Sequence, residues 1–216
     1  MNRTRSRTVV TAAVAALAAT LAGAPAQAHA KSKPLGTRSL AAVLTADRSG
    51  FDRNGRDFDV LTAAVLAVLK AKPASPVKVL TDGNTALTAF VPTDAAFQRL
   101  AKEVTGARRT PAERSAFTSV AGLGIDTVEA VLLYHVVPGA TIDRKAALKA
   151  DGAKLATAAG ASITVDVTRR WCVKRVTLID ADRNDRNPTV VKFDINRGNK
   201  QIAHAVDRVL RPVDLP

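Results

Sequence analysis

Residues 87–100 read LTAFVPTDAAFQRL, and residues 131–141 read VLLYHVVPGAT. Each stretch joins an apolar run to a break at a proline, Pro92 in the first and Pro138 in the second. The first apolar run is typical of a strand, and the residues after its proline follow helical spacing. In the second stretch we expect a helix that ends near Tyr134. The two stretches place a strand and two helices in the first two thirds of the chain.

Helix starts can be predicted from residues that cap helices. Thr93 is a good cap for the helix after Pro92, and Asp94 falls in the first turn, where the helix dipole favours negative charge. Further helix starts are predicted at Ser39, at Asp59, at the capping box Thr110-Pro111-Ala112-Glu113 and at the related sequence Asp126-Thr127-Val128-Glu129.

After Asp143 the hydrophobic period changes from helical to alternating. Ile163, Val165 and Val167 alternate with polar residues, as in a half-buried strand. Further strands are predicted at Trp171–Ile179, Thr189–Ile195 and Gln201–Leu210. A helix-rich first half followed by a strand-rich second half indicates an α+β fold. We find no internal repeat, and we expect one domain.

Three segments resemble the signature sequences of the fasciclin (FAS1) family. They are TAFVPTDAAF at 88–97, LYHVVPG at 133–139 and IAHAVDRVLRP at 202–212. The resemblance covers residues 38–212. It implies an α+β domain with a β-sandwich or wedge of strands and flanking helices in the N-terminal half. Such domains generally act outside the cell in binding and adhesion, not in catalysis.

The chain departs from the family pattern at three places. Gly198-Asn199-Lys200 stands where the family usually has Asn-Gly before the closing strand. The segment 47–56 is longer than usual, and the loop at 180–188 is unusually charged.

The first 30 residues read as a bacterial signal peptide. Three arginines precede an apolar run at 9–21, and small-x-small sites allow cleavage after Ala28 or Ala30. We expect a flexible tail at 31–37, the domain at 38–212 and a short tail at 213–216. The expected location is extracellular, either released or associated with the cell wall without a covalent bond or a transmembrane segment.

Charge is the strongest signal in the composition. The chain has 32 basic and 19 acidic residues, a net charge of +13, of which the leader supplies three. A cationic exported protein attracts polyanions such as teichoic acid or anionic polysaccharide. The alternative is a solvated surface that only keeps the protein soluble. Aromatic residues make up 4% of the chain, which argues against a stacking platform for nucleic acid.

One basic cluster stands out, because Arg169, Arg170, Lys174 and Arg175 bracket Trp171 where two strands are expected to meet. A hairpin would gather these charges at one end, where Arg binds phosphate and carboxylate in a bidentate manner. The alternative is protection of an edge strand by charge. Further basic residues that could extend the cluster are Arg183, Arg186, Arg197 and Lys200.

A second candidate binding segment is Tyr134-His135-Val136-Val137-Pro138. The family resemblance implies a role for a Tyr-His pair flanked by branched aliphatics in binding a cell-surface receptor. The physical alternative is a buried segment whose imidazole has a hydrogen-bond partner, and which reaches a partner only if it opens locally. His204 lies in register with Ile202 and Val206, which indicates a core histidine.

No catalytic or cofactor motif is found. A metal site would need His135, His204 and Cys172 to converge, and their spacing matches no zinc signature. Cys172, between Trp171 and Val173, is expected to be buried. The run Asp180-x-Asp182-x-Asn184 matches a calcium loop only in part.

The leading hypothesis is a secreted, monomeric, non-catalytic module that binds a cell-surface or matrix partner without a metal or cofactor. The first alternative is a cationic binder of envelope polyanions with no role in adhesion. The second is a secreted hydrolase that uses His135 or His204.

Overall fold

The computed structural model describes residues 34–171 and 173–214, which from Pro34 onward form one unit. The expected leader and Cys172 lie outside the described residues. The helices are α1 (Leu40–Leu44), α2 (Asp59–Ala71), the 3₁₀ helix η1 (Pro76–Thr81), α3 (Asp94–Thr105), α4 (Glu113–Ala121), α5 (Ile125–Tyr134) and α6 (Arg144–Ala147). The strands are β1 (Leu87–Pro92), β2 (Val136–Pro138), β3 (Lys154–Ala156), β4 (Ser162–Arg170), β5 (Val173–Ile179), β6 (Val190–Ile195) and β7 (Gln201–Val206).

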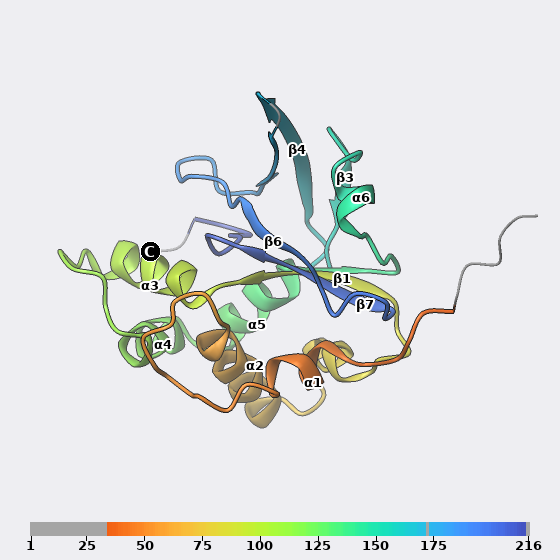
Figure 1. Cartoon of the computed structure of the whole chain (residues 1–216). Helices are drawn as coiled ribbons and strands as arrows, with labels where there is room; N and C mark the ends of the chain where they lie inside the picture. Colours follow the sequence, from red (N-terminus) through yellow and green to blue (C-terminus); the bar gives the residue numbers. More distant parts are fainter. Residues whose placement is uncertain (1–33, 172, 215–216) are drawn as a thin grey trace, which may run out of the picture. The chain divides into compact units, whose positions relative to one another are not determined.

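Two sheets organise the domain. One has the strand order β2-β1-β7-β6, and the other has the order β3-β4-β5 (Figure 1). In the first sheet β1 and β7 run parallel, with Leu87 opposite Gln201 and Pro92 opposite Val206. Every residue of β1 and β7 is buried, as expected for central strands covered on both faces.

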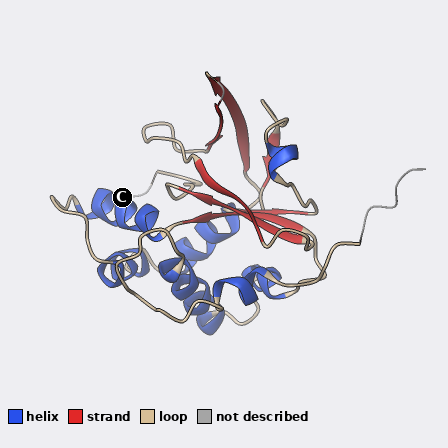
Figure 2. Ribbon diagram, in the orientation of Figure 1, coloured by secondary structure: helices blue, strands red, loops and turns tan. Residues whose placement is uncertain are grey.

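The core has two parts. In the first, helices α2, α3 and α5 pack with β1 and β7, and the helices lie on one side of the four-stranded sheet (Figure 2). In the second, Ile163, Val165, Val176 and Leu178 of the three-stranded sheet pack with residues that include Tyr134. The expected α+β fold with helices in the N-terminal half is confirmed.

The buried amide of Gln201 joins the helices to β7. Its Oε1 accepts from the N–H of Leu40 at 2.7 Å, and its Nε2 donates to the carbonyls of Val79 and Asp82, each at 2.8 Å. A fully buried amide needs such partners, because an unpaired one is costly to desolvate.

Part of the segment expected to form a flexible tail is anchored. Gly36 donates to the carbonyl of Gly198 at 2.8 Å and accepts from the N–H of Lys200 at 2.9 Å. This bridge places the start of the domain beside the turn before β7. The next residues pass close to Gly83, where a Cβ would overlap the carbonyl oxygen of Thr37.

Several predicted helix caps are wrong, although the helices themselves exist. Thr93 occupies the cap position of α3, but its side chain makes no capping hydrogen bond. Asp59 is the first residue of α2 and does not cap it. Instead Asp94, at the start of α3, accepts from the N–H groups of Asp59 at 3.0 Å and Val60 at 2.9 Å. A carboxylate from a neighbouring helix thus supplies the cap, which local sequence cannot reveal.

The two later caps also differ from the prediction. Helix α4 begins at Glu113, two residues after the proline of the expected box, and Ala112 precedes it without a side-chain cap. Glu113 Oε2 instead accepts from the N–H of Asp52 at 2.6 Å. Helix α5 begins at Ile125 after Gly124, which has a φ of 90° that favours glycine.

In the described part of the chain, no single helix is long and apolar enough to cross a membrane. Helices α4 and α5 meet those limits only when taken together, and they are bent by 107° at the break between them.

Candidate functional site

The β4–β5 hairpin ends in the predicted basic cluster. Arg169 lies opposite Lys174, Thr168 opposite Arg175, and Arg170 opposite Val173. The side chains of Arg169, Lys174 and Arg175 are exposed. The prediction that a hairpin gathers these residues is therefore confirmed by the strand register.

Trp171 lies in the turn at the hairpin tip. Its residue surface is 88% exposed, and Val173 beside it is 69% exposed. The expected burial of Cys172 lies outside the described residues, but the two apolar neighbours on which it was based are themselves exposed. The apolar side chains of Trp171 and Val173 therefore face solvent at the end of the hairpin.

The backbone of Trp171 is strained. Its φ is 57°, in the left-handed region that costs a residue with a Cβ roughly 1 kcal/mol. Packing does not explain why a large aromatic residue with a strained backbone is exposed. Such outliers concentrate at binding and switching sites, which makes the tip the best candidate for a contact surface.

The basic side chains near the tip form no ion pair within the described part of the chain. Among the ion pairs between described residues, none involves Arg169, Lys174 or Arg175. Arg169 and Lys174 face each other across the ladder, and like charges in that position repel. An anionic group bound between them would remove the repulsion.

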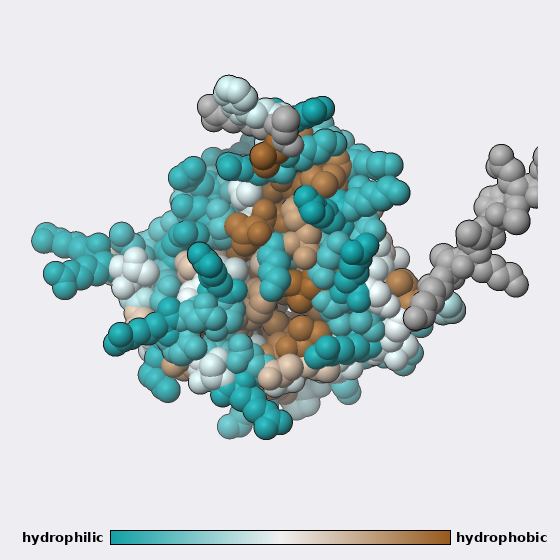
Figure 3. Space-filling view, viewed as in Figure 1, coloured by the Kyte–Doolittle hydropathy of each residue, from teal (hydrophilic) through white to brown (hydrophobic). Residues whose placement is uncertain are grey.

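One side of the hairpin combines apolar and basic residues. Thr168, Trp171, Val173 and Arg175 line a surface hollow on one side. Figure 3 shows hydrophilic side chains over most of this view of the molecule, with hydrophobic residues gathered along its middle and toward the hairpin end. The tip thus offers apolar and cationic groups together.

The other basic residues named from sequence lie elsewhere. Arg197 lies 4.0 Å from Asp194 in the β6–β7 turn, and the backbone of Lys200 is bonded to Gly36. Arg183 and Arg186 belong to the β5–β6 loop, and neither is part of the hairpin tip. The structure therefore does not gather these four around Trp171.

The Tyr134–Pro138 segment is mostly interior. Tyr134, His135, Val136 and Val137 are buried, and Pro138 is exposed. The Tyr134 hydroxyl donates to the carbonyl of Ser162 at 3.1 Å. These contacts support the structural interpretation, and a receptor-binding role stays a prediction that requires local opening.

Both nitrogens of His135 are engaged by the backbone. Nε2 accepts from the N–H of Leu210 at 2.9 Å, so Nδ1 carries the proton and donates to the carbonyl of Val131 at 2.7 Å. Burial lowers the pKa of His135 to about 4, although the hydrogen bond to Val131 opposes this shift. The ring is thus neutral and has no lone pair left for a metal or a substrate.

His204 has the same kind of environment on β7. Its Nδ1 accepts from the N–H of Asp194 at 3.1 Å, and its Nε2 donates to the carbonyl of Ile142 at 2.8 Å. Burial also lowers the pKa of His204. Both nitrogens of each imidazole are thus engaged by backbone groups, whereas the hydrolase hypothesis requires a histidine that is free to activate a nucleophile.

The loop that partly matches a calcium site is arranged around an arginine. Arg211 forms ion pairs with Asp182, at 3.3 Å, and with Asp185 and Glu103. Its backbone N–H also donates to Asp180 at 3.0 Å. The guanidinium thus lies among these acids and offsets part of their charge.

Sequence reasoning missed a second acidic cluster, where the segment 52–59 meets the starts of α3 and α4. Its members are Asp52, Asp57, Asp59, Asp94 and Glu113. Three acids in DRNGRDFD at 52–59 could have indicated part of this cluster. Asp94 and Glu113 could not be added to it, because they are distant in sequence. These are the described residues that could hold a metal.

Comparison with known proteins agrees with the fold. The model of the fasciclin domain family matches residues 61–212, and the chain belongs to this family. Among solved structures, the chain is similar to a FAS1 domain pair from the insect cell adhesion molecule fasciclin I, with 16% identity and a TM-score of 0.55. The match covers 82% of this chain and 51% of that one, so the chain spans about half the length of the insect protein pair. A search of curated proteins found no match.

Proposed function

We propose that the protein is a non-catalytic adhesion module that contacts its partner through the tip of the β4–β5 hairpin. The observation that carries the proposal is the exposed, strained Trp171 beside basic residues that form no ion pair within the described part of the chain. Membership of the fasciclin family and the likeness to an insect cell adhesion molecule support a role in adhesion. The engagement of both nitrogens of His135 and of His204 supports a function without catalysis.

The partner in this proposal carries anionic groups, as a sulfated or carboxylated polysaccharide, a teichoic acid or an acidic matrix protein does. Arg169 and Lys174 supply facing charges, and Trp171 supplies apolar area that can pack on a sugar ring or a side chain. Aromatic and arginine residues dominate the binding energy of many interfaces. Edge protection by charge remains the alternative for Lys174 and Arg175, which lie on the edge strand β5.

The test measures binding of the purified protein to heparin and to teichoic acid at two salt concentrations. The double variant Arg169→Ala/Lys174→Ala should bind at least about tenfold more weakly and with a smaller salt dependence, because fewer counterions are released. The matched control Arg108→Ala/Arg109→Ala removes the same charge from exposed residues of another loop. An equal loss in both double variants would show that net charge alone matters.

The variant Trp171→Ala separates adhesion from general polyanion binding. If matrix or cell-surface binding falls while binding to teichoic acid is unchanged, the protein is an adhesion module and the charges are auxiliary. If only salt-dependent polyanion binding is found, the protein is an envelope polyanion binder. Binding that survives all of these variants would refute the site.

We also propose export by a cleaved leader at residues 1–30, followed by the domain at 38–212. Cell fractionation with mass determination of the exported chain tests this proposal. A mature chain beginning at residue 29 or 31 supports it, and a full-length chain retained inside the cell contradicts it.

A further inference from the structure

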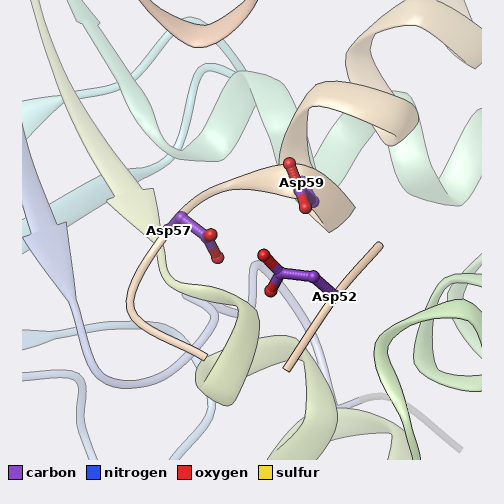
Figure 4. Close-up of side chains that lie close together, drawn as sticks. All are labelled: Asp52, Asp57 and Asp59. Atoms are coloured by element: carbon purple, nitrogen blue, oxygen red, sulfur yellow. The ribbon is translucent and has the colours of Figure 1, made fainter. Parts of the chain in front are cut away.

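The starts of three helices converge on one cluster of carboxylates. Asp59, Asp94 and Glu113 are the first residues of α2, α3 and α4, and Asp52 and Asp57 come from the loop before α2. Figure 4 shows the carboxylates of Asp52 and Asp57 pointing toward each other, with Asp59 beside them. Segments far apart in the sequence thus present acids to a common space.

Asp57 links two groups of possible ligands. Oxygens of Asp52, Asp57 and Asp59 lie within 4.8 Å of one another, and so do oxygens of Asp57, Asp94 and Glu113. A calcium ion bound at about 2.4 Å separates opposite ligand oxygens by about 4.8 Å. The spacing therefore fits a calcium ion without a large rearrangement.

Several of these oxygens are buried without a partner. Among the described residues, Asp57 Oδ1, Asp59 Oδ2 and Glu113 Oε1 make no hydrogen bond. Asp59 is 8% exposed and Glu113 is 1% exposed. A buried carboxylate oxygen that lacks a partner loses its solvation with no compensation, so the cluster is incomplete as it stands.

The acids of this cluster have no basic ion-pair partner in the described part of the chain. Of the ion pairs between described residues, none includes any of the five acids. Arg114, next to Glu113, lies over the ring of Phe51 at 5.1 Å. Three helix N-termini contribute roughly half a positive charge each, which does not balance five carboxylates.

The existing hydrogen bonds fix the acids in place. Asp94 is held by the N–H groups of α2, and Glu113 by the N–H of Asp52. Asn54 donates from its side chain to Asp57 at 2.9 Å. Ligands held in this way need little reorganisation to bind an ion. Asp52 is exposed, so an ion can enter the cluster from the solvent on that side.

We propose that this cluster binds a divalent cation of the calcium type, with Asp57 shared between the two groups of ligands. The donors are all carboxylate oxygens, which are the ligands that hard cations prefer. The ion would join the starts of α2, α3 and α4, a role separate from the hairpin tip.

The test follows thermal unfolding and isothermal calorimetry of the purified protein at pH 7.5, first in EDTA and then with added calcium or magnesium chloride. We expect one calcium site and a saturable rise in Tm of about 5 °C or more when calcium reaches a hundred times its Kd. Magnesium should act more weakly, because it requires shorter, octahedral coordination.

The variant Asp52→Asn/Asp57→Asn keeps an oxygen for each existing hydrogen bond but removes two charges. It should fold, and it should lose the calcium-dependent rise in Tm. The control variant Asp185→Asn removes one charge from the acidic loop around Arg211. It should keep the full calcium-dependent rise in Tm.

Three results would overturn the proposal. The first is that calcium produces neither heat nor a shift in Tm, which would mean that the acids hold protons instead. The second is that the Asp52→Asn/Asp57→Asn variant responds like the wild type. The third is that Asp185→Asn abolishes the response, which would assign it to the other loop.

Discussion

The imidazole of His135 accepts a hydrogen bond from the backbone N–H of Leu210, a residue 75 positions further along the chain. The contact joins the end of α5 to the segment that follows β7. The same ring donates to Val131 one helical turn earlier. His135 is therefore a structural bridge between the two halves of the chain, with both nitrogens in use.

Replacing His135 with alanine should destabilise the protein by about 3 kcal/mol. The substitution leaves a cavity and a buried N–H of Leu210 without an acceptor. Urea unfolding followed by circular dichroism measures the loss. Unchanged stability with lost partner binding would instead support a direct binding role for His135.

The contribution of His135 to the stability of the protein should fall as the pH drops from about 6.5 to 4. The folded pKa of His135 lies near 4, below its ordinary value of 6.5, so the unfolded chain takes up a proton first. The stabilisation is complete above pH 6.5 and is lost as the pH falls through 4. The loss from this residue is about 3 kcal/mol at most.

Unfolding free energies of the wild type and of His135→Gln between pH 4 and 7 isolate this effect. Glutamine does not titrate there, and the other groups contribute equally to both proteins. The difference between the two should shrink as the pH falls. If the unfolding free energies of the two proteins changed in parallel with pH, titration of His135 would not contribute to the pH dependence of stability.

Removal of the Asp94 carboxylate should weaken the start of a helix to which it does not belong. Asp94→Ala leaves the N–H groups of Asp59 and Val60 without their acceptor, with an expected loss of about 1–2 kcal/mol. Asp94→Asn keeps one acceptor oxygen and should lose less. Hydrogen exchange at Val60 reports the effect directly, and unchanged protection there would contradict it.

Gly83→Ala should be strongly destabilising, by about 3 kcal/mol or more, because the added Cβ overlaps the carbonyl of Thr37 and only a backbone shift relieves it. The neighbouring exposed residue Asn84 provides a control, since Asn84→Ala should change stability much less. Thermal unfolding compares the two variants. Equal melting temperatures would show that the segment before α1 is not held against Gly83.

Two substitutions of Trp171 should measure how much its backbone conformation and its side chain each contribute to stability. Trp171→Gly relieves the left-handed backbone and should be more stable than Trp171→Ala by about 1 kcal/mol. Trp171→Ala itself should change stability by less than about 0.5 kcal/mol, because the side chain is exposed. A large loss of stability in Trp171→Ala would mean that the tip packs against the body of the domain.

The sequence predicted the elements of the fold well, because their signals are local. The alternation at Ile163 to Val167 and the period around Phe97 follow from the side of each element that faces the core. Strand ends were less accurate: β7 ends at Val206, before the expected Leu210. The family resemblance supplied the architecture, which periodicity alone leaves open.

The candidate sites were predictable only in part. The basic hairpin follows from two strands that meet near Trp171, so the gathering of basic residues at its end could be predicted. The exposure of Trp171 could not be predicted, because Trp171 and Val173 are apolar residues of the kind that favours burial of the cysteine between them. The cap from Asp94 and the acidic cluster depend on contacts between helices, which a cap motif does not contain.

The parallel pairing of β1 with β7 has a consequence for how the protein acquires its structure. β1 lies between β2 and β7, and residues 201–206 come near the end of the described chain. The central sheet can close only after residues 201–206 have become available, and such non-local pairing slows folding. A chain that has not yet reached residue 206 is therefore left with an open edge on β1, which is a template for pairing with other chains.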